Sequence, residues 1–397
     1  MKKYLILAAA AVLTLASCAK VETYTENPVN DGSRMIGFSN YSPKSLTRAN
    51  DTYISGATLV DGKDFAVYAW NTNYGTYLGV NPGVPGFMNP AVVTYNSDVT
   101  DGDGNTYSPV RYWPSGDEPQ NLSFTAYYPY GGAGITAPTF STGVGSYAFE
   151  VQAAPANMVD FCVADVVNDQ VYSKTIASPT YPGTVKFTFK HQLTKVTFQF
   201  KKVTGLDDCT VIELTDADLS GIKNAGTLKA TYAQNANPGV IAGDGKQGTT
   251  TTTWDGVSGA AGYQLTLNNV NPQTTAQALT TTASTIHNND IFLMVPQDMA
   301  ADTQKLTVKW NVKVYDTKAH ADANGAEGLI TSTPNTKVLS LFSDLKKSDT
   351  DDTSVSAINW GMNNYINYTI TIGPKPIWFT AEVDEWDSVK NGYFNVQ

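Results

Sequence analysis

The chain has 397 residues, enough for two domains or one large β domain with a substantial hydrophobic core. Hydrophobic residues make up 42% of the chain and charged residues only 16%, a composition that disfavours a disordered protein and a coiled coil. The 36 acidic residues outnumber the 26 basic ones, and the resulting net charge of −10 has the wrong sign for a nucleic-acid partner.

The amino terminus has the features of an export signal. Lys2 and Lys3 precede an apolar run over residues 4–16, which is too short to span a bilayer as a helix. The run ends in Leu-Ala-Ser before Cys18, an arrangement that resembles the lipobox of bacterial lipoprotein precursors. We therefore expect residues 1–18 to be a lipoprotein signal peptide and Cys18 to carry lipid. The alternative is an ordinary signal peptide with an accidental cysteine.

Residues 19–48 are predicted to form a tether followed by one short strand. The tether is polar and patternless to about Asn30. Residues 34–39 then place Ile36 and Phe38 on one face of a strand. The Pro- and Ser-containing loop that follows is expected to expose Arg48 to proteases.

Residues 49–180 are predicted to form an amino-terminal β-sandwich domain. Aromatic and β-branched segments at residues 65–70, 91–95, 110–113, 122–129 and 147–151 are separated by clusters of Gly, Pro, Asn and Asp. The prolines and glycine of residues 177–183 suggest the domain boundary.

Residues 181–397 are predicted to form a second β-sandwich, so the expected fold class is all-β, with two sandwiches in tandem. The alternating pattern places Val185, Phe187 and Phe189 on one face of a strand. It likewise places residues 196, 198 and 200 on one face of the next strand. We expect these two strands to be adjacent. Residues 306–314 and 366–372 alternate in the same way. Short helices are expected near residues 216–224 and 341–347, and loops at the Thr- and Gly-rich residues 243–256 and 274–285.

The chain resembles the fimbrillin family of Bacteroidales, whose members are lipoprotein precursors of type V pili. The resemblance is carried by the Cys18 lipobox, the IGFS strand with LTRA around Arg48, FAVYAW, RYWP followed by LSFTAYYP, FKHQLTKVTFQF, and the carboxyl-terminal NYINYTITIG and PIWFTAEVDEW. It implies transthyretin-like or Greek-key sandwiches and a non-enzymatic fimbrial subunit.

The resemblance also implies assembly by strand exchange. A lipid-anchored precursor would reach the outer membrane, where an Arg-specific protease would cut between Arg48 and Ala49, and the mature form would join an extracellular fimbria that mediates adhesion to a host glycan or protein. The removable strand would be Met35, Ile36, Gly37 and Phe38. The candidate donor to the next subunit is the segment Tyr393, Phe394, Asn395 and Val396. The alternative is that residues 392–397 complete a sheet of their own domain.

Catalytic and metal-binding motifs are absent from the sequence. With three His and three Cys, we expect no enzyme activity, no cofactor and no metal. Asp101, Asp103 and Asn105 have the opening spacing of a calcium loop, but Tyr112 stands where a bidentate Glu is required, so a turn is favoured. His191 is expected to be a packed or hydrogen-bonded turn residue. Cys162 and Cys209 are expected to be buried free thiols.

A second functional class is a surface lipoprotein that binds glycans without polymerising. Tyr77, Phe87 and Trp254 lie in Gly-rich sequence that we expect to form loops, where exposed rings could stack on sugars. Aromatic residues of sandwich loops more often cap the core, which is the competing interpretation.

Overall fold

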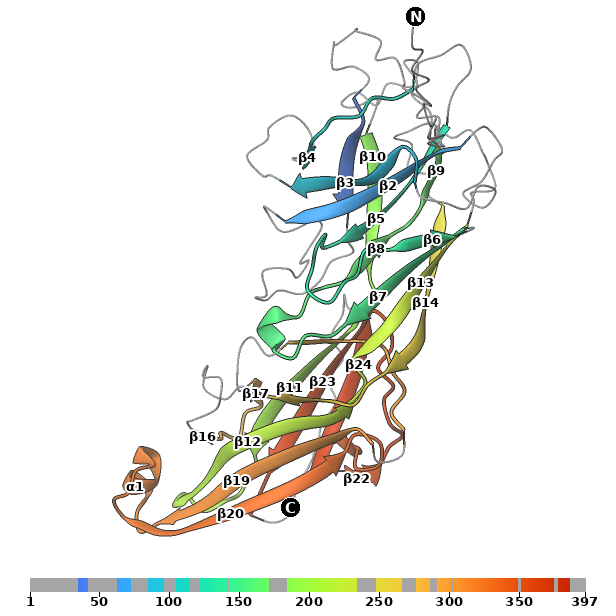
Figure 1. Ribbon diagram of the computed structural model, residues 1–397. Coiled ribbons are helices and arrows are strands. Elements are labelled where there is room, and N and C mark those ends of the chain that lie inside the picture. Colours follow the sequence, from blue (N-terminus) through green and yellow to red (C-terminus); the bar gives the residue numbers. More distant parts are fainter. Residues whose placement is uncertain are drawn as a thin grey trace, which may run out of the picture.

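The computed structural model describes residues 35–41, 63–72, 85–95, 105–114, 121–141, 143–170, 184–233, 248–265, 276–285, 291–300, 303–348, 351–374 and 378–385. These segments form four main β-sheets, one short hairpin and little helix, in an elongated molecule (Figure 1). The all-β prediction is confirmed. Among the described residues, no helix is both long and apolar enough to span a membrane.

The first sheet occupies one end of the molecule (Figure 1). Its strand order is β1-β10-β8-β5-β2-β3-β4, and β9 also pairs with β5. The strands are β1 (Gly37–Tyr41), β10 (Thr184–His191), β8 (Cys162–Ala164), β5 (Asn121–Tyr128), β2 (Asp64–Thr72), β3 (Met88–Tyr95), β4 (Asn105–Tyr107) and β9 (Val167–Gln170). A 3₁₀ turn, η1 (Pro155–Asn157), precedes β8.

The second sheet has the order β14-β13-β7-β6 and lies between the first sheet and the rest of the molecule (Figure 1). It contains β14 (Thr249–Ser258), β13 (Ala225–Ala233), β7 (Val144–Glu150) and β6 (Thr139–Ser141). Thr249–Ser258 is thus a strand and not the predicted loop, because it pairs with β13 from Ala233 to Ala225, and its five Thr residues lie opposite Lys229–Ala233. Threonine suits such a half-buried strand.

Two further sheets form the other end of the molecule. One has the order β17-β11-β23-β24, with β18 beside β11, and consists of β17 (Ser284–Thr285), β11 (Thr194–Lys202), β23 (Asn364–Ile372), β24 (Trp378–Glu385) and β18 (Phe292–Met294). The other has the order β15-β12-β19-β20, with β16 beside β12, and consists of β15 (Ala261–Gln264), β12 (Thr210–Ile222), β19 (Lys305–Tyr315), β20 (Leu329–Ser340) and β16 (Gln277–Ala278). The helix α1 (Lys318–Ala323) joins β19 to β20, and β21 (Lys346–Ser348) pairs with β22 (Asp351–Ser354).

The two helices predicted from the sequence are wrong. Residues 216–222 belong to β12, and residues 341–347 form a turn followed by β21. In β12 the pairing register shifts between Leu214 and Asp216, so the buried positions change from Ile212 and Leu214 to Ala217 and Leu219. At this β-bulge the buried apolar residues Leu214 and Ala217 are three residues apart instead of two. A spacing of three is typical of a helix, which explains the wrong prediction.

The predicted faces of the alternating strands are confirmed except at the end of β19, where Val312 and Val314 are only partly buried and Tyr315 is buried. One predicted neighbour is wrong. Val185, Phe187 and Phe189 are buried in the first sheet, and residues 196, 198 and 200 are buried in the sheet of β11. The chain leaves one sheet at His191 and enters another at Thr194, so β10 and β11 do not pair. An alternating pattern of apolar residues predicts which side chains of a strand face a core. It does not predict which strand pairs with it.

The sheets do not follow the division expected near residue 180. Strand β10 belongs to the first sheet, and β13 pairs with β7 over Ala225–Thr231 and Val144–Glu150. One hydrophobic core correspondingly runs from Tyr127 and Tyr147 to Ile366. A second core lies against the other face of the first sheet and contains Ile36, Phe38 and Phe187. This second core contains the candidate functional site.

Candidate functional site at the first strand

Strand β1 is an edge strand that lies parallel to β10. Its register places Gly37 beside Thr184, Phe38 beside Val185 and Tyr41 beside Thr188. The sequence supports a strand here because Ile36 and Phe38 alternate with a small residue and a polar one. A connection of at least a dozen residues is needed between parallel strands, and here the chain passes through most of the first sheet before β10 begins.

The two apolar side chains of this segment are fully buried. Ile36 is 0% exposed and Phe38 is 2% exposed, whereas Met35, at 45%, faces outward. The ring of Phe38 stacks on Phe187 with a centroid distance of 5.8 Å and meets Phe124 edge-on at 6.2 Å. Burial of such a side chain contributes about 1.5–3 kcal/mol. Loss of the segment would therefore expose a hydrophobic groove as well as a strand edge.

The other edge of β1 is held mainly by side chains. Asn105 Nδ2 donates a hydrogen bond to the main-chain oxygen of Phe38 over 3.0 Å, and Tyr107 Oη donates to that of Ile36 over 2.8 Å. The main-chain nitrogen of Ile36 donates to Arg111 O over 2.9 Å, and Met35 forms an isolated bridge with Tyr112. Burial raises the pKa of Tyr107 to about 12, so its hydroxyl remains protonated and can donate at neutral pH.

Asn105 and Tyr107 lie on β4, at the opposite end of the strand order from β1. The first sheet therefore curls until its two edges meet around the second core. The sequence around Asn105 is typical of a turn and gives no sign of this role. The strand predicted at residues 110–113 is wrong, because only the bridge at Tyr112 forms there and Val110 is 39% exposed.

Of the predicted site residues, the structure describes Met35, Ile36, Gly37 and Phe38. The lipidation site Cys18, the cleavage site at Arg48 and Ala49, and the donor candidate Tyr393–Val396 lie outside the described residues. Arg48 and Ala49 fall between the end of β1 at Tyr41 and the start of β2 at Asp64. A cut at that bond would separate β1 from the rest of the chain.

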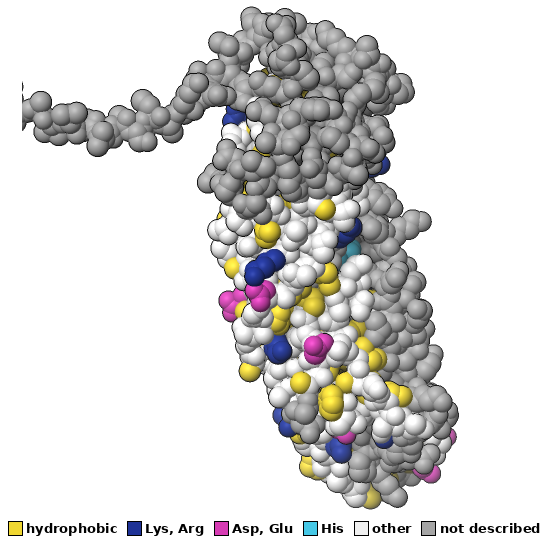
Figure 2. Space-filling view, turned by 90° about the vertical axis from the view of Figure 1, so that its right-hand side faces the viewer, with side chains coloured by type: hydrophobic (Ala, Val, Ile, Leu, Met, Phe, Trp, Pro, Cys, Tyr) yellow, Lys and Arg dark blue, Asp and Glu magenta, His cyan; other side chains and the backbone are white. Residues whose placement is uncertain are grey.

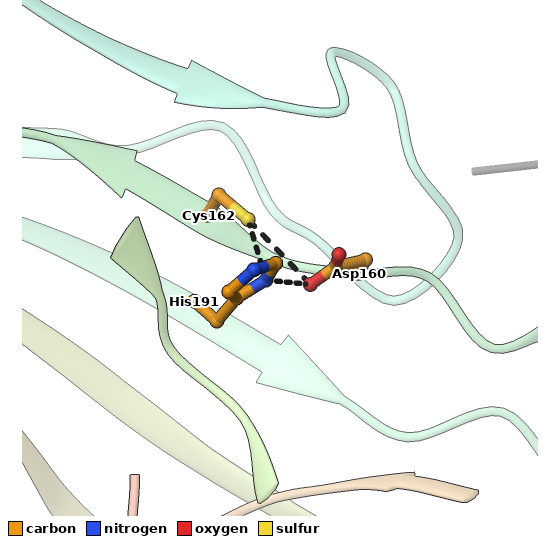
Figure 3. A group of neighbouring side chains, drawn as sticks. All are labelled: Asp160, Cys162 and His191. Atoms are coloured by element: carbon orange, nitrogen blue, oxygen red, sulfur yellow. Dashed lines mark hydrogen bonds and ion pairs between the residues drawn. The ribbon is translucent and has the colours of Figure 1, made fainter. Parts of the chain in front are cut away.

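A second cluster lies where β8 and β10 pair, and consists of Asp160, Cys162 and His191 (Figure 3). Nδ1 of His191 is 2.8 Å from Asp160 Oδ1 and 3.4 Å from the sulfur of Cys162, and the sulfur is 3.5 Å from Asp160 Oδ1. All three side chains are buried. No local sequence pattern indicates this cluster, because residues 160 and 162 are far from His191 in sequence.

The chemistry of this cluster is that of a hydrogen-bonded network. Its three ligand atoms lie close enough together to hold a metal ion. However, burial raises the pKa of the Cys162 thiol well above its usual value, and the nearby Asp160 carboxylate raises it further. With no metal bound, the thiol is therefore protonated at neutral pH and can take part in the hydrogen bonds with Asp160 and His191. These bonds join the end of β10, the strand that carries β1, to the segment that enters β8. The interpretation of His191 as a hydrogen-bonded residue is confirmed.

Two of the three aromatic residues considered for sugar stacking pack against the cores. Trp254 lies on β14, donates its indole N–H to Gln192 O over 2.8 Å, and has its ring centroid 6.0 Å from that of Phe149. Phe87 is half-buried against the second core. Tyr77 lies outside the described residues. On the face drawn in Figure 2, acidic and basic side chains are interspersed and form no basic patch.

The two thiols differ in their surroundings. Both Cys162 and Cys209 are free, and Cys162 is buried as predicted. Cys209 is partly exposed, so the expectation that it is buried is wrong. It lies just before β12, in a turn where its main-chain nitrogen donates to Asp207 Oδ1 over 2.8 Å.

Comparison with known proteins places this fold in a class. The sequence profile described as fimbrillin-like matches residues 47–386, and the chain belongs to the fimbrillin-like family. A fimbrial protein from Bacteroides vulgatus ATCC 8482 is similar in structure, with a TM-score of 0.50 and 18% identity over 89% of this chain and 99% of that one. No significant match is found among curated proteins.

Two other solved structures are similar at lower scores. A putative cell adhesion protein from Bacteroides uniformis ATCC 8492 has a TM-score of 0.42 and 17% identity, over 90% of this chain and 99% of that one. A fimbrilin from Porphyromonas gingivalis W83 has a TM-score of 0.36 and 9% identity, over 90% of this chain and 99% of that one.

Proposed function

We propose that this protein is a structural subunit of a surface fimbria that assembles by protease-triggered strand exchange. In this proposal the precursor is lipidated at Cys18 and carried to the outer membrane, and an Arg-specific protease cuts between Arg48 and Ala49. Strand β1 then leaves, and an extended segment of a neighbouring subunit takes its place. Membership of the fimbrillin-like family supports the role of fimbrial subunit, and its members are structural proteins with no enzymatic role.

The observation that carries the exchange step is the position of Ile36 and Phe38. Both are fully buried, Phe38 in β1 and Ile36 directly before it, and the link from β1 to the rest of the sheet contains the predicted cleavage site. Before cleavage, β1 covers the groove and one main-chain edge of β10. An uncovered edge strand is a template for pairing with another chain. Cleavage would thus convert a closed monomer into one that is complete only when a second copy supplies a strand.

The donor segment stays a prediction from the sequence. In an extended Tyr393–Val396 segment, Phe394 and Val396 would lie on one face. Their spacing of two residues is the same as that of Ile36 and Phe38. The bound strand would dissociate slowly, because its apolar side chains and its main-chain hydrogen bonds must be lost together. Adhesion to a host glycan or protein is proposed on the same basis as the fimbrial role, and no described aromatic cluster identifies the ligand.

Limited proteolysis of the folded precursor tests the proposal. An Arg-specific protease, which leaves Lys44 in the same link uncut, is expected to cut first after Arg48. The cut protein should then form multimers that resist detergent and dissociate on heating. Arg48→Ala precursor should stay monomeric, whereas Arg34→Ala, the matched control at the other flank of β1, should still be cut and polymerise. Cut protein that remains monomeric at all concentrations would contradict strand exchange. Mass spectrometry of the native protein tests both the mature amino terminus and the lipid on Cys18.

A further inference from the structure

We propose that Asn105 and Tyr107 form a main-chain clamp for any strand that lies in the groove of β1, and that the groove selects a small residue between two apolar ones. The expected occupant after cleavage is an extended segment of a second copy of this chain. The part of this inference that concerns an incoming strand rests on the proposed function. The part that concerns the resident strand does not.

The clamp binds atoms that every strand possesses. Asn105 Nδ2 donates to the carbonyl of Phe38, and Tyr107 Oη donates to that of Ile36. Carbonyls two residues apart point to the same side of a strand, so two donors on one neighbouring element can bind both. The clamp is therefore indifferent to side-chain identity, which suits a site whose occupant is exchanged.

The resident strand does not use the whole clamp. Asn105 Oδ1 is buried and has no hydrogen-bond partner among the described residues. The amide orientation is fixed because Phe38 O can only accept, so nitrogen must face it and oxygen must face elsewhere. A buried acceptor without a partner is destabilising. In the same register, the main chain of an incoming strand presents the same groups as that of β1, so only a side-chain N–H offered to Oδ1 would make one bond more than β1 makes.

Selectivity for a small residue comes from the β10 side of the groove. Gly37 lies directly beside Thr184, and a Cβ added to Gly37 would lie 3.0 Å from Thr184 Oγ1. Contacts this short are rare, so the Thr184 hydroxyl would have to move. On either side of this position, Ile36 and Phe38 fill the apolar groove. The groove thus accepts the pattern apolar, small, apolar.

This pattern bears on the predicted donor. Aligned with β1 in the same direction and register, Phe394 and Val396 would take the places of Ile36 and Phe38, and Asn395 would take that of Gly37. The Cβ of Asn395 would then press on the Thr184 hydroxyl. Asn395→Gly is therefore expected to speed multimer growth about 3- to 10-fold in cleaved protein. Slower growth or no change would overturn selection of a small residue in this donor.

Hydrogen exchange in the uncleaved full chain tests the clamp itself. Tyr107→Phe keeps the ring that lies 5.2 Å from Phe38 and removes only the hydroxyl. The hydroxyl donates to Ile36 O and also accepts from Arg111 N over 3.1 Å, so both bonds are lost. The amides of Gly37–Tyr41 should then exchange at least about 3- to 10-fold faster, and Asn105→Ala, which removes the bond to Phe38 O, should also speed their exchange. Tyr130→Phe, an exposed tyrosine away from β1, should leave them unchanged. Wild-type exchange rates in both clamp variants would overturn the clamp.

A double-mutant cycle tests the contact with Gly37. Gly37→Ala alone should speed exchange of the β1 amides, and adding Thr184→Ala, which removes the opposing hydroxyl, should restore most of the wild-type protection. If the two changes are simply additive, Thr184 is not the selecting contact. These measurements need no cleavage or assembly, so their failure is distinct from a failure of polymerisation.

A synthetic peptide with the sequence of residues 35–41 tests the incoming strand. Added in excess to freshly cleaved protein, it should block multimer growth, and the same peptide with Gly37→Val should need at least about tenfold more for the same block. If both peptides are equally effective, selection of a small residue is overturned. If neither peptide slows multimer growth, the groove is not the exchange site. This conclusion would hold even if hydrogen exchange confirms the clamp on the resident strand.

Discussion

Phe38 stacks on Phe187 with the ring planes within 20° of each other and the centroids 5.8 Å apart. One ring belongs to β1 and the other to β10, its parallel neighbour. In the proposed assembly the first strand leaves and the second stays. The stack is therefore a contact that an incoming side chain must replace.

Phe38→Ala is expected to destabilise the uncleaved protein by about 3–5 kcal/mol, because it leaves a cavity in a closed core. The measurement is urea unfolding, together with the rate of proteolysis between β1 and β2, which should rise. Phe342→Ala, at a side chain that is 41% exposed, is the matched control and should cost little. Equal effects of the two changes would contradict the described burial of Phe38.

Thiol labelling should distinguish the two cysteines of the mature chain. Burial raises the pKa of Cys162 well above its usual value, so this thiol should react with iodoacetamide only after unfolding. Cys209 is accessible, but partial desolvation and the neighbouring Asp207 raise its pKa as well. It should therefore label slowly at pH 7 and faster as the pH rises. Peptide mass spectrometry assigns the label, and rapid reaction of Cys162 in folded protein would contradict the closed core.

The helix α1 should be most stable in mildly acidic solution. A hydrogen bond to Asp316, with 2.6 Å between His320 Nδ1 and Asp316 Oδ1, raises the pKa of His320 above 6.5, and the same bond lowers that of Asp316 below 3.8. The histidine contribution is complete below pH 6.5 and disappears as the pH rises through the higher folded pKa. The aspartate contribution is complete above pH 3.8 and disappears as the pH falls through the lower folded pKa.

Amide exchange of Lys318–Ala323, corrected for the intrinsic pH dependence, should therefore be slower at pH 5.5 than at pH 8.5. His320→Gln should abolish most of this difference. A difference that survives the substitution would assign the effect to another group.

Lys195→Met is expected to stabilise the protein at pH 7 by about 1–3 kcal/mol. Burial lowers the pKa of Lys195 from 10.5 to about 8, so the charged ammonium is disfavoured in the folded state. The cost is complete below about pH 8 and disappears as the pH rises towards 10.5. The gain from methionine, measured by urea unfolding, should thus shrink at pH 9.5.

Part of the Lys195 cost is offset by the Tyr365 ring, whose centroid lies 4.6 Å from the ammonium nitrogen. Lys186→Met, at an exposed position of β10, is the control and should be nearly neutral at both pH values. Destabilisation by Lys195→Met at pH 7 would show that this contact outweighs the burial.

The sequence was sufficient to predict the strands that alternate without interruption. Leu306, Val308 and Trp310 are buried as their even spacing predicts, and so are Ile366, Tyr368 and Ile370. The prediction failed where local rules are broken, as at the bulge after Leu214, or where a polar strand such as Thr249–Ser258 is stabilised by pairing.

Of the candidate site, the buried residues of the first strand could be predicted from the sequence, but the residues that bind this strand could not. Burial of Ile36 and Phe38 follows from their alternation, but nothing local to Asn105 or Tyr107 indicates that their side chains bind a strand more than sixty residues earlier in the chain. The Asp160, Cys162 and His191 cluster was missed for the same reason. Contacts of this kind depend on which strands become neighbours, and hydrophobic periodicity does not specify that.

The passage from β10 to β11 has a mechanical consequence. Only Gln192 and Leu193, both buried, separate the strand that bears β1 from the strand that pairs in parallel with β23. A force applied to the first sheet through β10 is therefore transmitted to β11, in the far half of the molecule, through only two intervening residues. Because β11 and β23 run parallel and pair over residues 195–202 and 365–372, tension along β11 loads their hydrogen bonds in shear. Bonds loaded in this way yield together, so the pairing of β11 with β23 should resist stretching far better than peeling.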